Sequence, residues 1–265
     1  MSRLGLDYGT TNTVVVCSDR GRYPVVPHMA ETAVGPVAQE VFPSLAAYDR
    51  EADRFVFGFE AERCLCRPGA GQRFEVVRSL KRLIKHYTEG GRLGRDMTSR
   101  GLDAAVVLRG FADALRESVL RSGLFSAAEP LETVLTWPAN ANGAQRHLTR
   151  RCFREAGFDV IGTLSEPAAA AIEFADRIAR GNRPESRRLS MSVGVFDLGG
   201  GTFDVSLVKV SGADFQVIEA LGIEELGGDD FDRVLAGLFS GRMGADMSGL
   251  TPFQRTLLLR HARQQ

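Results

Sequence analysis

Two short segments combine aspartate, glycine and threonine in the same order, and these residue types suit the binding of phosphate. Residues 4–16 read LGLDYGTTNTVVV, and residues 195–208 read VFDLGGGTFDVSLV. In each segment an apolar run ends in an aspartate, a turn of glycine and threonine follows, and a second apolar run begins. Glycine lets a ligand approach the backbone closely, and the N–H groups of such a turn can form a concave nest for phosphate oxygens. Each segment is therefore predicted to be a β-hairpin whose turn binds phosphate.

The aspartates that precede the two turns, Asp7 and Asp197, indicate a metal ion. A carboxylate beside a phosphate repels it unless a cation lies between them, and Mg²⁺ with its water shell is suited to that place. One such turn alone would more often be an ordinary hairpin, but a pair favours a nucleoside triphosphate held between two facing turns. The sequence contains neither the GxxxxGK[ST] pattern of a P-loop nor a GxGxxG segment after a strand.

Composition and charge exclude several other classes of protein. The chain has 265 residues, of which 44% are hydrophobic and 25% charged, and its formal net charge is zero. A neutral chain is not expected to bind nucleic acid or an anionic membrane through phosphate contacts. No apolar run approaches the ~20 residues of a membrane span. The four cysteines, Cys17, Cys64, Cys66 and Cys152, are interpreted as reduced thiols, which favours a cytoplasmic location.

The order of predicted elements is that of an α/β protein in two parts. Helical periodicity predicts helices over 101–121 and 144–157, and a strand ends at Pro138 between them. A strand, a turn and a long alanine-rich helix follow, and residues 60–87 read as helix and loop. Three further strands and a helix near Asp229 come after a charged segment without periodicity. We predict lobe I over 1–180, a linker over 181–190 and a partial lobe II over 191–265.

Six segments of this sequence resemble the ATPase domain of the heat shock protein 70 (DnaK-like) chaperone family. They occur in the family's order: LGLDYGTTNT, LKRLIK, TWPANANGAQR, SEPAAAAIEF, VFDLGGGTFDVSLV and LGGDDFD. The resemblance implies an actin-like ATPase fold, with two ribonuclease-H-like lobes around a nucleotide cleft and the second lobe incomplete. It implies ATP or ADP as ligand, Mg²⁺ as the metal, and K⁺ as a further candidate ion.

The resemblance also assigns roles to individual residues. The metal would be held through water by Asp7, Asp197 and Glu166. Catalysis would involve Lys81, Glu166, Asp204 and Thr202. Nucleotide would be bound by three groups of residues: Gly9, Thr10, Thr11 and Asn12; Gly199, Gly200, Gly201 and Thr202; and Gly227, Gly228 and Asp229.

Three residues match positions that relay the nucleotide state to a peptide-binding half, namely Thr136, Pro138 and Arg146. The implied partners are a co-chaperone or nucleotide-exchange factor, and client peptides only through a domain that this sequence does not contain. The chain departs from the family nearby, because Trp137 and Asn140 stand where small apolar and aromatic residues are favoured.

The predicted function is that of an ATP-binding and ATP-hydrolysing domain of a heat-shock-70-like chaperone. The resemblance runs from the first residues to about Phe239 and is weak after that, and the later glycine-serine-arginine loop that contacts adenosine is not found. We therefore expect weak ATP affinity. Two alternatives stay open: a nucleotide-binding pseudo-ATPase or actin-like scaffold, and a sugar- or acetate-kinase type of phosphotransferase. No motif for the acceptor pocket of such a kinase is present.

Overall fold

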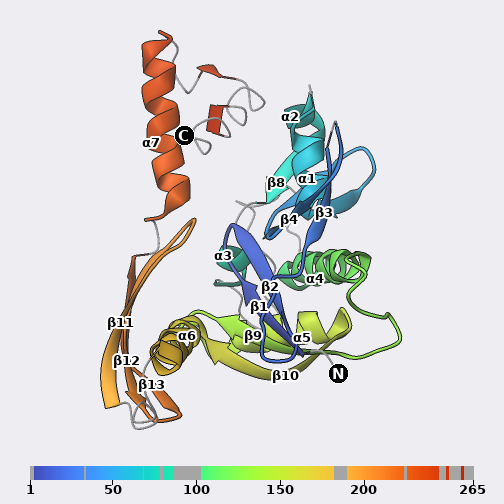
Figure 1. Ribbon diagram of the computed structural model, residues 1–265. Helices are drawn as coiled ribbons and strands as arrows, with labels where there is room; N and C mark the ends of the chain where they lie inside the picture. The colour runs from blue at the N-terminus through green and yellow to red at the C-terminus, as the bar shows by residue number, and fades with distance from the viewer. Residues whose placement is uncertain are drawn as a thin grey trace.

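The computed structural model describes residues 3–32, 34–67, 69–77, 80–85, 103–181, 190–223, 226–244, 249–250 and 258–259. The fold is mixed α/β, as expected, with helices placed between and after groups of strands along the chain (Figure 1). In the described ranges, none of the helices has the length and hydropathy needed to cross a membrane.

The central sheet has five strands in the order β10-β9-β1-β2-β5. Its strands are β1 (Arg3–Tyr8), β2 (Asn12–Ser18), β5 (Phe42–Pro43), β9 (Leu131–Trp137) and β10 (Phe158–Ser165). Strands β1 and β2 form the predicted antiparallel hairpin, with Leu6 opposite Val15, whereas β9 pairs in parallel with both β1 and β10. Parallel pairing places the C-terminal ends of β1 and β9 at the same edge of the sheet. The residues that follow these strands are thereby brought together.

Two predicted helices, α4 (Ala104–Arg121) and α5 (Gly143–Glu155), supply much of the core. Helix α4 buries Val107, Phe111 and Leu115, whose spacing puts them on one face of the helix. Helix α5 begins with a capping box in which Asn142 and Gln145 bond each other's backbone N–H groups. Both helices were predicted correctly from periodicity because their apolar faces are continuous.

A smaller group of elements lies beside α4 (Figure 1). It contains the hairpin of β3 (His28–Thr32) and β4 (Gly35–Gln39), and a sheet in the order β7-β6-β8. The bounds are β6 (Ala46–Asp49), β7 (Arg54–Phe57), β8 (Phe74–Val77), α1 (Gly58–Leu65), α2 (Ala70–Arg73) and α3 (Leu80–Lys85). The helix-and-loop prediction for 60–87 is wrong at β8. Four residues are too few to show a period, and pairing with β6 makes them a strand.

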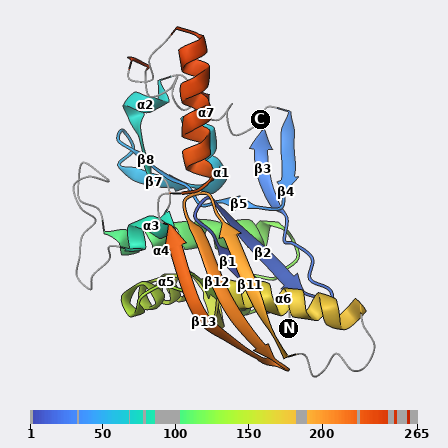
Figure 2. The ribbon, with the colours of Figure 1, turned by 90° about the vertical axis from the view of Figure 1, so that its left-hand side faces the viewer.

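The third part is an antiparallel sheet of β11 (Ser190–Leu198), β12 (Phe203–Ser211) and β13 (Asp214–Ile223), followed by α7 (Gly228–Arg242). Helix α6 (Glu166–Gly181) contacts this sheet and also β9 and β10, so it lies between the two sheets (Figures 1 and 2). No turn separates β10 from α6, in contrast to the prediction. Residues 182–189 of the predicted linker lie outside the described residues, and the two domain boundaries stay predictions.

Candidate functional site

The turn of the β1–β2 hairpin presents backbone donors. Gly9 N–H donates to the carbonyl of Asp7 at 3.2 Å, which closes the turn. A side chain at Gly9 would overlap the carbonyl oxygen of Asn12, so this position requires glycine. Within the described residues, the backbone N–H groups of Thr10 and Thr11 donate no hydrogen bond. These groups are available to an external acceptor such as a phosphate oxygen.

Backbone hydrogen bonds connect the turn of the β11–β12 hairpin to the start of α7. Gly199 N–H donates to Thr202 O at 2.9 Å within the turn. The carbonyl of Gly199 accepts from Gly228 N–H at 3.0 Å, and that of Gly200 accepts from Asp229 N–H at 2.7 Å. The turn thus has its carbonyls bonded to α7. Gly228 and Asp229, which the resemblance assigns to nucleotide binding, stabilise the glycine turn here through these backbone hydrogen bonds.

The two hairpin turns touch each other. A Cβ atom at Gly200 would lie 2.9 Å from Thr11 Cβ and would overlap Thr11 Oγ1. The hydroxyl of Thr11 is buried and has no hydrogen-bond partner among the described residues. Gly200 is therefore required by the close approach of the hairpins, a reason that the sequence did not reveal. The approach brings the candidate phosphate-binding turns of both segments to one place.

Lys81 of α3 and Glu166, the first residue of α6, form an ion pair next to these turns. The two side chains are only 17% and 16% exposed. Burial raises the pKa of Glu166, the charge of Lys81 opposes that change, and the charges of Asp7 and Asp197 add to it. The electrostatic coupling shows that residues separated by long stretches of sequence converge on one region.

The predicted aspartates surround the same region. Asp197 and Asp204 face each other across β11 and β12, and Thr136 Oγ1 donates to Asp7 Oδ1 at 2.7 Å. Burial raises the pKa of Asp197; Lys81 opposes this, and Asp204 and Asp7 reinforce it. In the part of the chain that the structure describes, no three acidic, His or Cys side chains are close enough to coordinate one metal ion directly.

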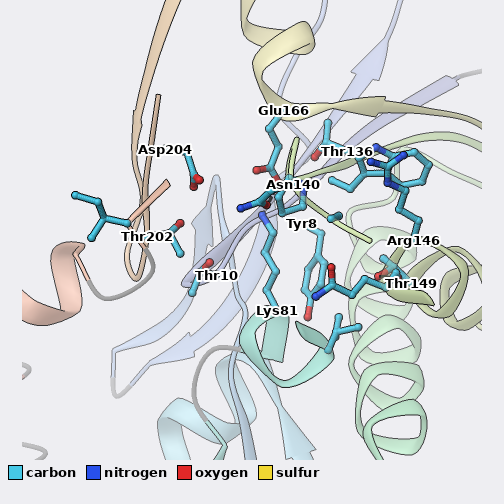
Figure 3. A pocket seen from close by; sticks show the side chains of 16 residues that line it. Tyr8, Thr10, Lys81, Thr136, Asn140, Arg146, Thr149, Glu166, Thr202 and Asp204 are labelled. Atoms are coloured by element: carbon cyan, nitrogen blue, oxygen red, sulfur yellow. Dashed lines mark hydrogen bonds and ion pairs between the residues drawn. The ribbon is translucent and has the colours of Figure 1, made fainter. Parts of the chain in front are cut away.

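A cavity of about 250 Å³ opens beside the ion pair (Figure 3). Its hairpin end is lined by Thr10, Lys81, Glu166, Thr202, Asp204 and Ile223. Its other end, which we call the α5 end, is lined by Tyr8, Ile84, Thr136, Trp137, Pro138, Asn140, Ala141, Gln145, Arg146 and Thr149. Asp197 lies outside this cavity and lines a smaller one together with Glu166 and Asp204. The structure thus brings the predicted catalytic residues together.

The α5 end contains the three predicted relay residues, Thr136, Pro138 and Arg146, together with residues that were not predicted. The guanidinium of Arg146 lies over the Trp137 ring, 5.2 Å from its centroid. The capping-box pattern of Asn142 and Gln145 is readable in the sequence and could have placed Gln145 at the start of a helix. No pattern pointed to Tyr8. Its ring is buried in the core and contacts the Phe111 ring at a centroid distance of 5.5 Å.

The fold and the site define an α/β protein that presents two glycine–threonine turns to a cavity with one lysine and several carboxylates. Comparison with known proteins identifies the family. The Hsp70 protein family model matches residues 124–249. The stromal 70 kDa heat shock-related protein of Pisum sativum chloroplasts is 31% identical over 260 residues, which cover 92% of this chain and 34% of that protein.

Two further relatives agree. The chaperone protein HscA homolog of Pseudomonas aeruginosa is 32% identical over 272 residues, covering 96% of this chain and 40% of the relative. The chaperone protein dnaK of Cyanophora paradoxa is 29% identical over 254 residues, covering 89% and 37%. The chain is a member of the Hsp70 family and corresponds to an Hsp70-like chaperone ATPase domain, as the six motifs indicated. It spans about a third of the length of these relatives.

Proposed function

We propose that this chain binds Mg²⁺ and ATP between its two hairpin turns and hydrolyses ATP to ADP and phosphate. The observation that carries the proposal is the convergence of both turns, with unbonded N–H groups in the β1–β2 turn, on a cavity that also contains the Lys81–Glu166 ion pair. Backbone N–H groups and a lysine are the groups that stabilise the charge on a transferring phosphoryl group. Such an activity would serve as a conformational timer.

Each predicted residue has a place in this proposal. Lys81 places its positive charge where the γ-phosphate develops charge, and Glu166 holds the Lys81 ammonium in position through the ion pair. Thr202 donates its hydroxyl to the phosphate chain. Asp204, which lines the same end of the cavity, accepts a hydrogen bond from the attacking water.

The carboxylates fit Mg²⁺ held through its water shell. The charge of Asp7 raises the pKa of both Glu166 and Asp197, and the charge of Asp197 also raises the pKa of Glu166, but the described residues offer no direct coordination set. Mg²⁺ keeps most of its waters in proteins, so carboxylates at the distance of a bridging water suit it. When bound, the ion neutralises charge on the phosphates. K⁺ stays a candidate for the same region.

The finer architecture is also part of the proposal. We infer two lobes of an actin-like ATPase, 1–180 and 191–265, that move about the cavity as nucleotide is bound and released. Thr136, Pro138 and Arg146 would pass the nucleotide state to a peptide-binding half and to exchange factors in the whole protein. A chaperone role and a cytoplasmic location belong to that whole-protein proposal.

Single-turnover hydrolysis of radiolabelled ATP tests the chemistry. We expect Lys81→Ala to lower the rate of phosphate release about 10²–10³-fold, the usual loss when one charge-stabilising group is removed. Glu166→Ala should lower it as well, because Lys81 loses its partner. Lys209→Ala is the matched control, since Lys209 is exposed on β12 and lies outside the cavity.

The outcome also separates the alternatives. Free phosphate as product supports an ATPase, and a phosphorylated small molecule supports a phosphotransferase. ATP binding without turnover identifies a pseudo-ATPase, and ATP-dependent sedimentation identifies a filament-forming scaffold. If neither Lys81→Ala nor Glu166→Ala slows phosphate release, the assigned roles are wrong.

A further inference from the structure

Strands β1, β9 and β10 are parallel neighbours, so their C-terminal ends lie at the same edge of the central sheet. Leu6 of β1 pairs with Leu135 of β9, and the next residues of these strands, Asp7 and Thr136, therefore lie beside each other. Glu166 begins α6 directly after β10. Thr136 thus comes from the strand between the two that lead to Asp7 and Glu166, and it lines the cavity together with Glu166 (Figure 3).

The orientation of the Asp7 carboxylate depends on Thr136. The hydroxyl of Thr136 donates to Asp7 Oδ1 at 2.7 Å. Among the described residues, no other group donates a hydrogen bond to either oxygen of this carboxylate. On its other side Asp7 is opposite Val14 of β2, and a valine side chain has no donor. Asp7 Oδ2 is therefore left for a donor from outside the described chain.

Thr136 is well placed to restrain the carboxylate. Strand β9 is paired on both sides, with β1 and with β10, and Thr136 is opposite Leu164 of β10. A threonine side chain has a restricted χ1 torsion, because two heavy atoms branch from its Cβ. The torsion that turns a carboxylate, χ2 of aspartate, has broad preferences instead. A stiff donor on a strand with two neighbours thus fixes a group that would otherwise rotate.

The hydrogen bond between Thr136 and Asp7 belongs to a strong class. A hydroxyl that donates to an ionised carboxylate forms a bond about twice as strong as one between neutral groups. Thr136 is half-buried, so its hydroxyl is partly protected from competing water. Groups that orient a metal-binding carboxylate in this way are a general feature of metal sites, and their loss weakens metal binding.

We propose that Thr136 is a positioning residue for the metal ion, which acts by orienting the Asp7 carboxylate. Its hydroxyl holds Asp7 Oδ1, and Oδ2 remains to accept a hydrogen bond from a metal-bound water. The inference rests on the proposed function, in which Asp7 holds Mg²⁺ through water. It gives Thr136 a task at the metal, whereas the resemblance assigned this residue to the relay toward a peptide-binding half.

Calorimetric titration with ADP, once in excess MgCl₂ and once in EDTA, measures the gain in ADP affinity that the metal supplies. Thr136→Val keeps the branched shape of the side chain and removes the donor. We expect this variant to lower the gain about tenfold, the low end of the loss of about 10–100-fold for a group that orients a metal ligand. The ratio of the two affinities is the readout, because a general structural effect lowers both affinities alike and leaves their ratio unchanged.

Three further variants test whether the hydroxyl acts through Asp7. Thr136→Ser restores a hydroxyl and should recover most of the gain. In an Asp7→Ala background, Thr136→Val should lower the gain no further, because the effects of two residues that act as a unit do not add. Thr163→Val is the matched control and should keep the wild-type gain. Thr163 lies on the neighbouring strand β10, outside the cavity, and its hydroxyl has no hydrogen bond among the described residues.

The outcomes distinguish this inference from the proposed function. A wild-type chain that binds ADP no more tightly with Mg²⁺ than with EDTA contradicts the proposed Mg²⁺ site, and the inference falls with it. A wild-type gain that Thr136→Val leaves unchanged overturns the inference alone. The same holds for a loss of ADP affinity that is equal with Mg²⁺ and with EDTA, or for one that adds to the effect of Asp7→Ala, because Thr136 then acts on a group other than the Asp7 carboxylate.

Discussion

Substituting Gly200 tests whether the two hairpins meet as the structure indicates. In Gly200→Ala the new Cβ would lie 2.9 Å from Thr11 Cβ and would overlap Thr11 Oγ1, whereas ordinary contacts of a Cβ begin at 3.4 Å. The carbonyl of Gly200 is bonded to Asp229 N–H at 2.7 Å, so the turn is restrained from moving back. The hairpins must therefore separate, or the bond to α7 must break.

The expected cost follows from that overlap. Overpacking of a buried contact typically costs about 1–3 kcal/mol, and we expect the free energy of unfolding to fall by this amount. Urea denaturation followed by circular dichroism measures it, and calorimetry with ADP should show weaker binding because the phosphate-binding turns are displaced. For a chain of this size, each kcal/mol corresponds to a fall of about 2–4 °C in melting temperature.

The neighbouring glycine is the control for this prediction. In Gly199→Ala the nearest atom to the new Cβ is Thr202 O at 3.5 Å, an ordinary contact. We expect its stability to change by less than about 0.5 kcal/mol, the usual limit for a substitution that disturbs no neighbour. The double variant Thr11→Ala with Gly200→Ala should recover part of the loss, because the overlapping hydroxyl is gone. Equal stability of the two single alanine variants would refute the hairpin contact.

Three predictions concern the scaffold. Burial lowers the pKa of His28 to about 4, and the unfolded state takes up a proton near pH 6.5, so stability should fall by about 1–3 kcal/mol as the pH drops from 6.5 to 4. His28→Gln should flatten this pH dependence in urea denaturation, and His147→Gln, on the exposed side of α5, should leave it unchanged. Asn142→Ala removes the side chain that accepts the Gln145 N–H at 2.9 Å at the start of α5. The free energy of unfolding should fall by about 0.5–2 kcal/mol, measured by urea denaturation. Phe111→Ala empties a fully buried site and should cost about 3–5 kcal/mol by the same assay; a loss below 1 kcal/mol would contradict the core assignment.

Local sequence patterns were sufficient for most of the elements. Helix α4 was predicted because one continuous apolar face needs only the 3.6-residue period, and the hairpins were predicted because glycine-rich turns separate two apolar runs. The short strand β8 could not be predicted in this way. Its four residues, Phe74–Val77, form a strand only because β6 lies beside them.

The candidate site likewise combines features that the sequence predicts with features that arise only from tertiary packing. The sequence was enough to single out Asp7, Asp197 and the glycine turns, because a turn's backbone donors depend on residues adjacent in the chain. The Lys81–Glu166 pair joins residues 85 positions apart, and its ion pair exists only once α3 and α6 have packed. The contact of Gly200 with Thr11 arises from packing as well. Local chain geometry limited the kinds of chemistry available, and long-range packing decided which groups meet.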